Sequence, residues 1–135
     1  MRKVLIPVDG TARSLKSIEL VKNLYKPGEV SITLMMVREN YISSAPHAIV
    51  PVDLDAGEAS EKMKEIAAMI PEYDPQISIV LGLAGDKILE CAKKDDIDLI
   101  IMTKSTKKGW LQAIGSVTTQ VVKYAPCMVL IAPEV

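Results

Sequence analysis

The sequence lacks the features that direct a protein to nucleic acid, to a membrane or to export. Its 16 basic and 17 acidic residues leave a net charge of -1, whereas a dedicated nucleic-acid surface needs a large basic excess. No apolar run approaches the roughly 20 residues of a membrane span. The opening segment MRKVLIPVD is too short and too strand-like for a signal peptide. We therefore expect a cytoplasmic protein with no nucleic-acid partner and no membrane partner.

Residues for redox, metal and acid–base chemistry are also few. The two cysteines, Cys91 and Cys127, lie far apart in apolar settings, where a thiol packs as a small hydrophobic side chain. His47 is the single histidine, and no cluster of His, Cys or carboxylates has the spacing of metal ligands. The motifs Gly-x-x-x-x-Gly-Lys-Ser/Thr and Gly-x-Gly-x-x-Gly are both missing. We expect no metal and no catalytic residue, and hence no enzyme, with slow ATP hydrolysis as the one activity left open.

Apolar runs and helical stripes alternate along the chain. Hydrophobic residues make up 49% of the 135 residues and charged residues 24%, which suits one folded domain over residues 1–135. Short apolar runs predict strands, and apolar residues at helical spacing predict the helices between them. Strands are expected over 4–8, 30–37, 77–81, 98–102 and 128–132, and helices near 15–25, 53–70, 84–94 and 117–125.

This alternation predicts an α/β fold, with a single doubly wound domain and a five-stranded parallel sheet covered by helices on both faces. The strand orders 2-1-3-4-5 and 3-2-1-4-5 are both common for such a sheet. Thr11 or Ser14 could cap the first helix through a side-chain oxygen. The stretch Glu39–Pro51 is the least regular. Its apolar residues could form a lid, contact a partner, or pack on the domain's own helices.

The loop after the fourth expected strand has the composition of a phosphate-binding loop. Lys104, Ser105, Thr106, Lys107, Lys108 and Gly109 follow the strand, and Gly115-Ser116 opens a helix. In a 3-2-1-4-5 sheet a ligand lies between strands one and four, so Asp9 would face this loop. Asp9 could accept hydrogen bonds from adenine or ribose, and the loop could take phosphates. The alternatives are a simple turn at Asp9, a solvated lysine run and an ordinary helix start.

Three segments resemble the universal stress protein family: VLIPVDGTARS, GDKILECAKKDDIDLIIM and GSVTTQVVKYAPCMVLI. They cover nearly the whole chain in the family's order. The resemblance implies a 3-2-1-4-5 sheet of the adenine nucleotide alpha hydrolase type. It also implies a homodimer through antiparallel pairing of the last strands, here 127–133, because an uncovered apolar edge strand invites aggregation. Interface residues would be Met128, Val129, Leu130, Ile131 and Ala132; Pro133 and the tail 134–135 would favour the alternative, a monomer.

One branch of this family binds ATP through Gly, two residues, Gly, nine residues and then Gly-Ser or Gly-Thr. Here Thr103 and Thr106 occupy the first two glycine positions, and only eight residues, 107–114, precede Gly115. Threonine is poorly suited to positive φ, so these changes should narrow the pocket and misdirect the backbone N–H groups. By resemblance, the candidate nucleotide-binding residues are Pro7, Val8, Asp9, Val37, Thr103, Lys104, Thr106, Gly109, Gly115, Ser116 and Val117.

Two functional hypotheses follow. The leading one is a dimeric stress-response protein that requires no cofactor, does not bind ATP tightly and acts through protein partners. The alternative is a switch that binds ATP or another adenine nucleotide in the crevice between strands one and four, with loop lysines holding phosphates weakly and in a salt-sensitive way. No motif indicates which proteins the partners are.

Overall fold

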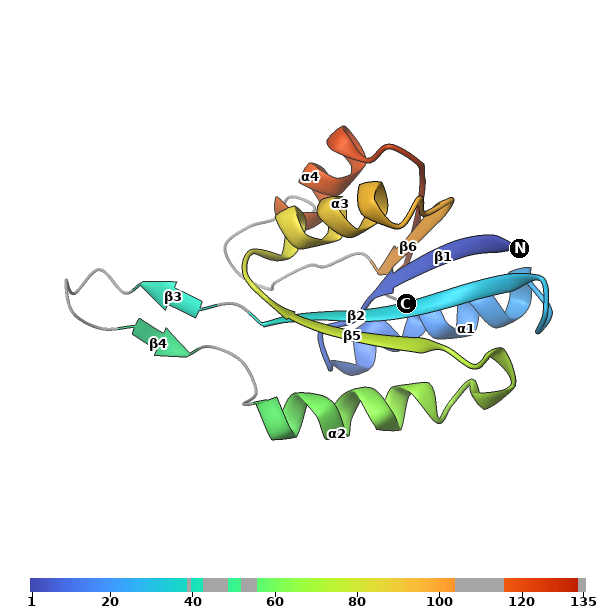
Figure 1. Cartoon of the computed structure of the whole chain (residues 1–135), viewed down its shortest axis with the longest axis horizontal. Helices are drawn as coiled ribbons and strands as arrows, with labels where there is room; N and C mark the ends of the chain where they lie inside the picture. Colours follow the sequence, from blue (N-terminus) through green and yellow to red (C-terminus); the bar gives the residue numbers. More distant parts are fainter. Residues whose placement is uncertain (39, 43–48, 52–55, 104–115, 134–135) are drawn as a thin grey trace.

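A five-stranded parallel sheet forms the centre of the molecule (Figure 1). The computed structural model describes residues 1–38, 40–42, 49–51, 56–103 and 116–133. The strands of the sheet are β1 (Arg2–Pro7), β2 (Val30–Arg38), β5 (Gln76–Leu81), β6 (Leu99–Thr103) and β7 (Met128–Ala132). The helices are α1 (Leu15–Leu24), α2 (Ala56–Ala67), α3 (Ala84–Lys94) and α4 (Ser116–Tyr124), with 3-10 turns at Ala12–Ser14 and Pro71–Tyr73.

The strand order is β5-β2-β1-β6-β7, which is 3-2-1-4-5 when the strands of this sheet are numbered along the chain. All neighbouring pairs are parallel; Ile6 lies opposite Leu34, and Leu5 lies opposite Ile100. The family-implied order is therefore confirmed, and 2-1-3-4-5 is excluded. The expected helices and strands are present; α2 ends at Ala67 rather than at 70, and a 3-10 turn at Pro71–Tyr73 follows.

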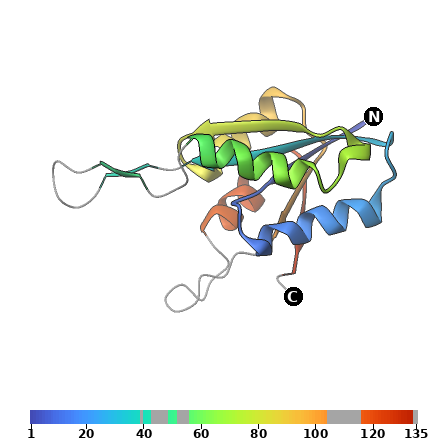
Figure 2. The same ribbon diagram turned by 90° about the horizontal axis from the view of Figure 1, so that it is seen from below.

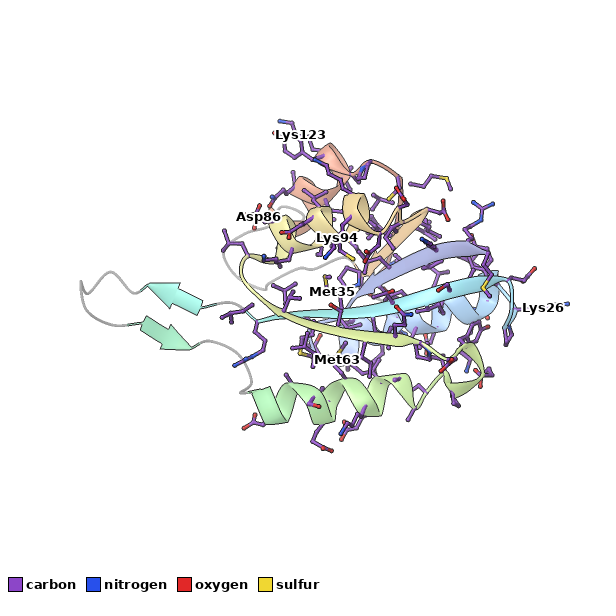
Figure 3. All side chains as sticks on the ribbon, viewed as in Figure 1. Lys26, Met35, Met63, Asp86, Lys94 and Lys123 are labelled. Carbon is purple, nitrogen blue, oxygen red and sulfur yellow. The ribbon has the colours of Figure 1, made fainter. Side chains whose placement is uncertain are left out.

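Each face of the sheet packs against its own pair of helices (Figures 1 and 2). Met63 of α2 lies in the cluster with α1, whereas Met35 of β2 lies in the cluster beneath α3 and α4 (Figure 3). Neighbouring strand residues alternate between the clusters, as Val4 and Leu5 do. Both faces are covered, which is why these strands read as almost continuous apolar runs.

The start of α1 differs from the expected side-chain cap. Ser14 precedes the helix, but its hydroxyl donates to the Thr11 carbonyl oxygen at 2.8 Å and caps no helical N–H group. The Thr11 hydroxyl donates to Asp9 instead. The predicted cap is therefore wrong, because a 3-10 turn separates the loop from α1 and the two hydroxyls bond within that turn.

The stretch 39–51 contains regular structure that the sequence did not indicate. β3 (Asn40–Ile42) and β4 (Ile49–Pro51) form a two-stranded antiparallel sheet in which Tyr41 pairs with Val50. Aromatic and β-branched residues favour such pairing. Both views show this hairpin extending beyond the main sheet and away from the helices (Figures 1 and 2).

No helix within the described ranges is long and apolar enough to cross a membrane.

Candidate functional site

A cavity of about 160 Å³ opens at the carboxyl ends of β1 and β6. At this point the chain leaves β1 for one face of the sheet and leaves β6 for the other, which is where ligands bind in doubly wound sheets. Its lining comes from β1 and the loop after it, β2, β6, the turn before α1, and the first turns of α3 and α4: Pro7, Val8, Asp9, Ser14, Met35, Val37, Ala84, Ile88, Met102, Thr103, Val117 and Thr118.

The cavity brings together many of the residues proposed from sequence. Pro7, Val8, Asp9, Val37, Thr103 and Val117 all line it. Ser116 is the exposed first residue of α4 and is not in the lining. Lys104, Thr106, Gly109 and Gly115 lie outside the described residues.

Sequence reasoning missed the other half of the lining, which consists of Ser14, Met35, Ala84, Ile88, Met102 and Thr118. Met35 could have been found, because it lies two residues before Val37 and so faces the same side of the strand. Ala84 and Ile88 carried no such signal, since only the packing of α3 over the sheet brings them to this edge.

Asp9 shapes the loop after β1. Its Oδ1 accepts hydrogen bonds from the Thr11 backbone N–H at 2.9 Å and from the Thr11 hydroxyl at 2.6 Å. Aspartate often closes turns in this way. The carboxylate is exposed and also lines the cavity. Asp9 thus closes a turn and also borders the cavity.

Thr103 is held in place by a buried hydroxyl of α1. The Ser17 and Thr103 hydroxyl oxygens lie 2.8 Å apart, and Ser17 is fully buried. The bond fixes the Thr103 side chain at the end of β6, where it forms part of the cavity wall. A glycine at this position would leave that volume empty and would free the backbone conformation.

Two further buried hydroxyl groups line the cavity. The Ser14 hydroxyl donates to the Thr11 carbonyl oxygen. Thr118, in the first turn of α4, is only 2% exposed, and its hydroxyl has no hydrogen-bond partner among the described residues. Among the described residues of the lining, Asp9 is the single charged side chain.

The two cysteines lie outside this lining. Burial, reinforced by the Asp95 carboxylate that accepts from the thiol, raises the pKa of Cys91 to about 11. Burial likewise raises the pKa of Cys127. Both are free thiols packed against the cluster beneath α3 and α4. At neutral pH they are protonated, as expected for small hydrophobic side chains.

Within the described parts of the chain, no group of three or more His, Cys, Asp or Glu side chains could hold a metal ion. His47 lies outside these parts.

Comparison with known proteins gives one consistent result. The model of the universal stress protein family matches residues 1–133. Universal stress protein MJ0531 from Methanocaldococcus jannaschii is 28% identical over 144 aligned positions, covering 98% of this chain and 82% of that protein.

Solved structures of universal stress proteins have a fold similar to that of this chain. Universal stress protein UspA from Lactobacillus plantarum superposes with a TM-score of 0.79 at 21% identity, covering 97% of each chain. A universal stress protein in complex with cAMP superposes with a TM-score of 0.71 at 18% identity, covering 99% of this chain and 98% of its own. At these identities the superpositions establish a shared fold.

Proposed function

The chain belongs to the universal stress protein family, and from that premise we propose that it is a non-catalytic, cytoplasmic, homodimeric stress-response protein that does not hold ATP tightly and acts through protein partners. The observation that carries this proposal is the bonded Thr103 side chain in the cavity wall.

Tight phosphate binding by a loop requires the backbone to approach the ligand closely. Thr103 opposes this approach in two ways. Its side chain adds volume where ATP-binding relatives have glycine, and its hydroxyl is bonded to fully buried Ser17. Moving the side chain aside would leave the Ser17 hydroxyl without this partner, which is unfavourable in a buried position. The bonded Thr103 side chain therefore favours weak binding of a triphosphate.

The edge position of β7 supports the dimer. This strand pairs with β6 on one side, and no described strand pairs with its other side, where its N–H and C=O groups could bond to a second strand. Met128 is 58% exposed, and Val129, Leu130 and Ile131 are half-buried. Antiparallel pairing with a second β7 would satisfy the backbone and cover these side chains.

A second candidate function is a switch that binds an adenine nucleotide. The cavity favours it, because Pro7, Val8, Asp9 and Val37 meet at its β1 and β2 side. A protein of the same fold has been solved with cAMP. Under this alternative the adenosine would enter the cavity beside Asp9, and phosphates would lie toward the start of α4.

Calorimetry at low salt with Mg-ATP, AMP and cAMP separates the two candidates. For the wild-type protein we expect no measurable heat with Mg-ATP, and no nucleotide after denaturing extraction. The double variant Thr103→Gly/Thr106→Gly should gain ATP affinity, and adding Gly115→Val should remove that gain. Stoichiometric nucleotide in the purified wild-type protein, lost in the single variant Gly115→Val, would show that the switch is correct instead.

Sedimentation tests the dimer independently of any ligand. We expect the wild-type protein to sediment as a dimer and Met128→Lys to weaken it, because a charge would be placed on the edge strand. Val122→Lys is the matched control, since Val122 is 55% exposed on α4. A monomeric wild-type protein, or equal effects of the two variants, would refute dimerisation through β7.

A further inference from the structure

We propose that the cavity at the carboxyl ends of β1 and β6 is a site for a small, uncharged, single-ring molecule with one hydrogen-bonding group, and that this group pairs with the Thr118 hydroxyl. The inference rests on the proposed function, in which the same site does not hold ATP tightly.

The size of the cavity sets the size of the ligand. Its volume is about 160 Å³. An apolar cavity of roughly 150 Å³ engineered into a protein core binds benzene. One six-membered ring with a small substituent therefore fits the described part of this cavity.

The walls select an apolar ring. Met35 of β2, Met102 of β6 and Ile88 of α3 line the cavity and belong to the cluster beneath α3 and α4. All three are nearly fully buried. Methionine adapts its shape to a ligand and makes favourable contacts between its sulfur and an aromatic ring. An unsaturated ring is thus the moiety that these side chains suit best.

The hydroxyl groups of the lining differ in whether they already have a hydrogen-bond partner in the described protein. Ser14 donates to the Thr11 carbonyl oxygen, and Thr103 shares a hydrogen bond with Ser17. Thr118 is 2% exposed, yet its hydroxyl has no hydrogen-bond partner among the described residues. Buried hydroxyl groups without a partner are rare and unfavourable. A ligand that hydrogen-bonds to Thr118 removes this deficit, which gives the site its directional contact.

Charge excludes the anionic version of such a ligand. Asp9 is the charged side chain in the described lining, and this residue is exposed. A phosphate or carboxylate on the ring would be brought toward a like charge, which is unfavourable. An uncharged hydroxyl or amide carries no such penalty.

Phenol and benzene are the probes that test the hydrogen bond. They would be titrated separately into the full-length protein while backbone amide resonances are followed by NMR. We expect phenol to bind the wild-type protein about tenfold more tightly than benzene, which is the difference that one modest hydrogen bond supplies. Resonances of Ile88 and Val117 should shift. Equal affinities, or no binding of phenol, would overturn the proposal without any variant.

Variants locate the hydrogen bond. Thr118→Val keeps the shape and removes the hydroxyl, so phenol affinity should fall about tenfold to that of benzene. Thr118→Ser keeps the hydroxyl and should bind phenol more tightly than benzene. Thr119→Val is the matched control on the exposed side of α4 and should leave phenol affinity unchanged. Undiminished phenol binding by Thr118→Val would refute the assignment.

Two further ligands separate this proposal from the proposed function. Phenyl phosphate should bind more weakly than phenol, and tighter binding would overturn the uncharged class. Tight binding of Mg-ATP would overturn the proposed function, whereas the comparison of phenol with benzene would still decide the role of Thr118.

Discussion

The hydrogen bond between Ser17 and Thr103 can be tested with a double-mutant cycle of Ser17→Ala and Thr103→Val. The two hydroxyl oxygens are 2.8 Å apart. Their surroundings differ, because Ser17 is fully buried under β6 whereas Thr103 is half-buried at the cavity wall. Each substitution removes one hydroxyl with little change of volume. Because the hydroxyl that is left behind is buried in one case and half-buried in the other, the two single variants should lose different amounts of unfolding free energy.

The burial of each remaining hydroxyl predicts which variant loses more unfolding free energy. Thr103→Val leaves the Ser17 hydroxyl buried without its partner, which should reduce the free energy of unfolding by about 1–3 kcal/mol. Ser17→Ala leaves Thr103, which still reaches the cavity and solvent, so the loss should be about 0.5–1.5 kcal/mol. The double variant should resemble Ser17→Ala, so the coupling energy should equal the cost of Thr103→Val, about 1–3 kcal/mol. In a domain of this size, Thr103→Val should lower Tm by roughly 3–10 °C.

Urea unfolding followed by circular dichroism measures all four proteins. Ser31→Ala is the matched control, because Ser31 is exposed on β2 and its removal should change stability by no more than about 0.5 kcal/mol. Additive losses, or a smaller loss for Thr103→Val than for Ser17→Ala, would refute the claim that Ser17 fixes Thr103. The structural support for weak ATP binding would then be lost as well.

Three other predictions concern packing and titration. A β-carbon at Gly85 would overlap the Gln120 side chain, whose Nε2 donates to Asp86 Oδ1 at 2.8 Å, so Gly85→Ala should cost about 1 kcal/mol in urea unfolding. In a Gln120→Ala background the same change should be neutral or stabilising, because alanine favours helix by up to about 1 kcal/mol over glycine; a loss there equal to that in wild type would contradict this account. Ile100→Ala, at a fully buried position of β6, should reduce the free energy of unfolding by about 2–5 kcal/mol, whereas Leu83→Ala, at a residue 62% exposed, should change it by about 0.5 kcal/mol or less. Comparable losses in the two variants would contradict the assignment of Ile100 to the core. The Cys91 thiol should support stability fully below pH 9.0, its ordinary pKa, and lose that support as pH rises toward about 11, because the unfolded chain ionises first. Asp95→Asn should speed alkylation of Cys91 near neutral pH by removing the carboxylate that raises this pKa, and an unchanged rate would reject that cause.

The order of the helices and strands could be read from the chain because each strand of this fold is covered on both faces. Residues such as Val4 and Leu5 enter different clusters on opposite faces, so the strand becomes an uninterrupted apolar run. One helix separates each run from the next, and a strand–helix–strand connection favours a parallel sheet. Composition and spacing left two strand orders open, and the resemblance of three segments to a known family decided between them.

Part of the site was equally accessible from sequence. The carboxyl ends of the first and fourth strands of the sheet meet wherever the order is 3-2-1-4-5, so this order alone predicts that Asp9 and Thr103 border one crevice, as they do. The hairpin formed by β3 and β4 was not found, because strands of three residues give too short a pattern to distinguish from a loop.

The sequence by itself determined the element order, the family, and the location of the crevice, because these depend on local periodicity and on motifs with fixed spacing. Only the tertiary structure decided what the crevice contains. Thr103 meets Ser17 across 86 positions of sequence, and Thr118 is buried without a hydrogen-bond partner among the described residues. No local pattern encodes either fact, because which hydroxyl is paired depends on how α1 and α4 pack against opposite faces of the same sheet.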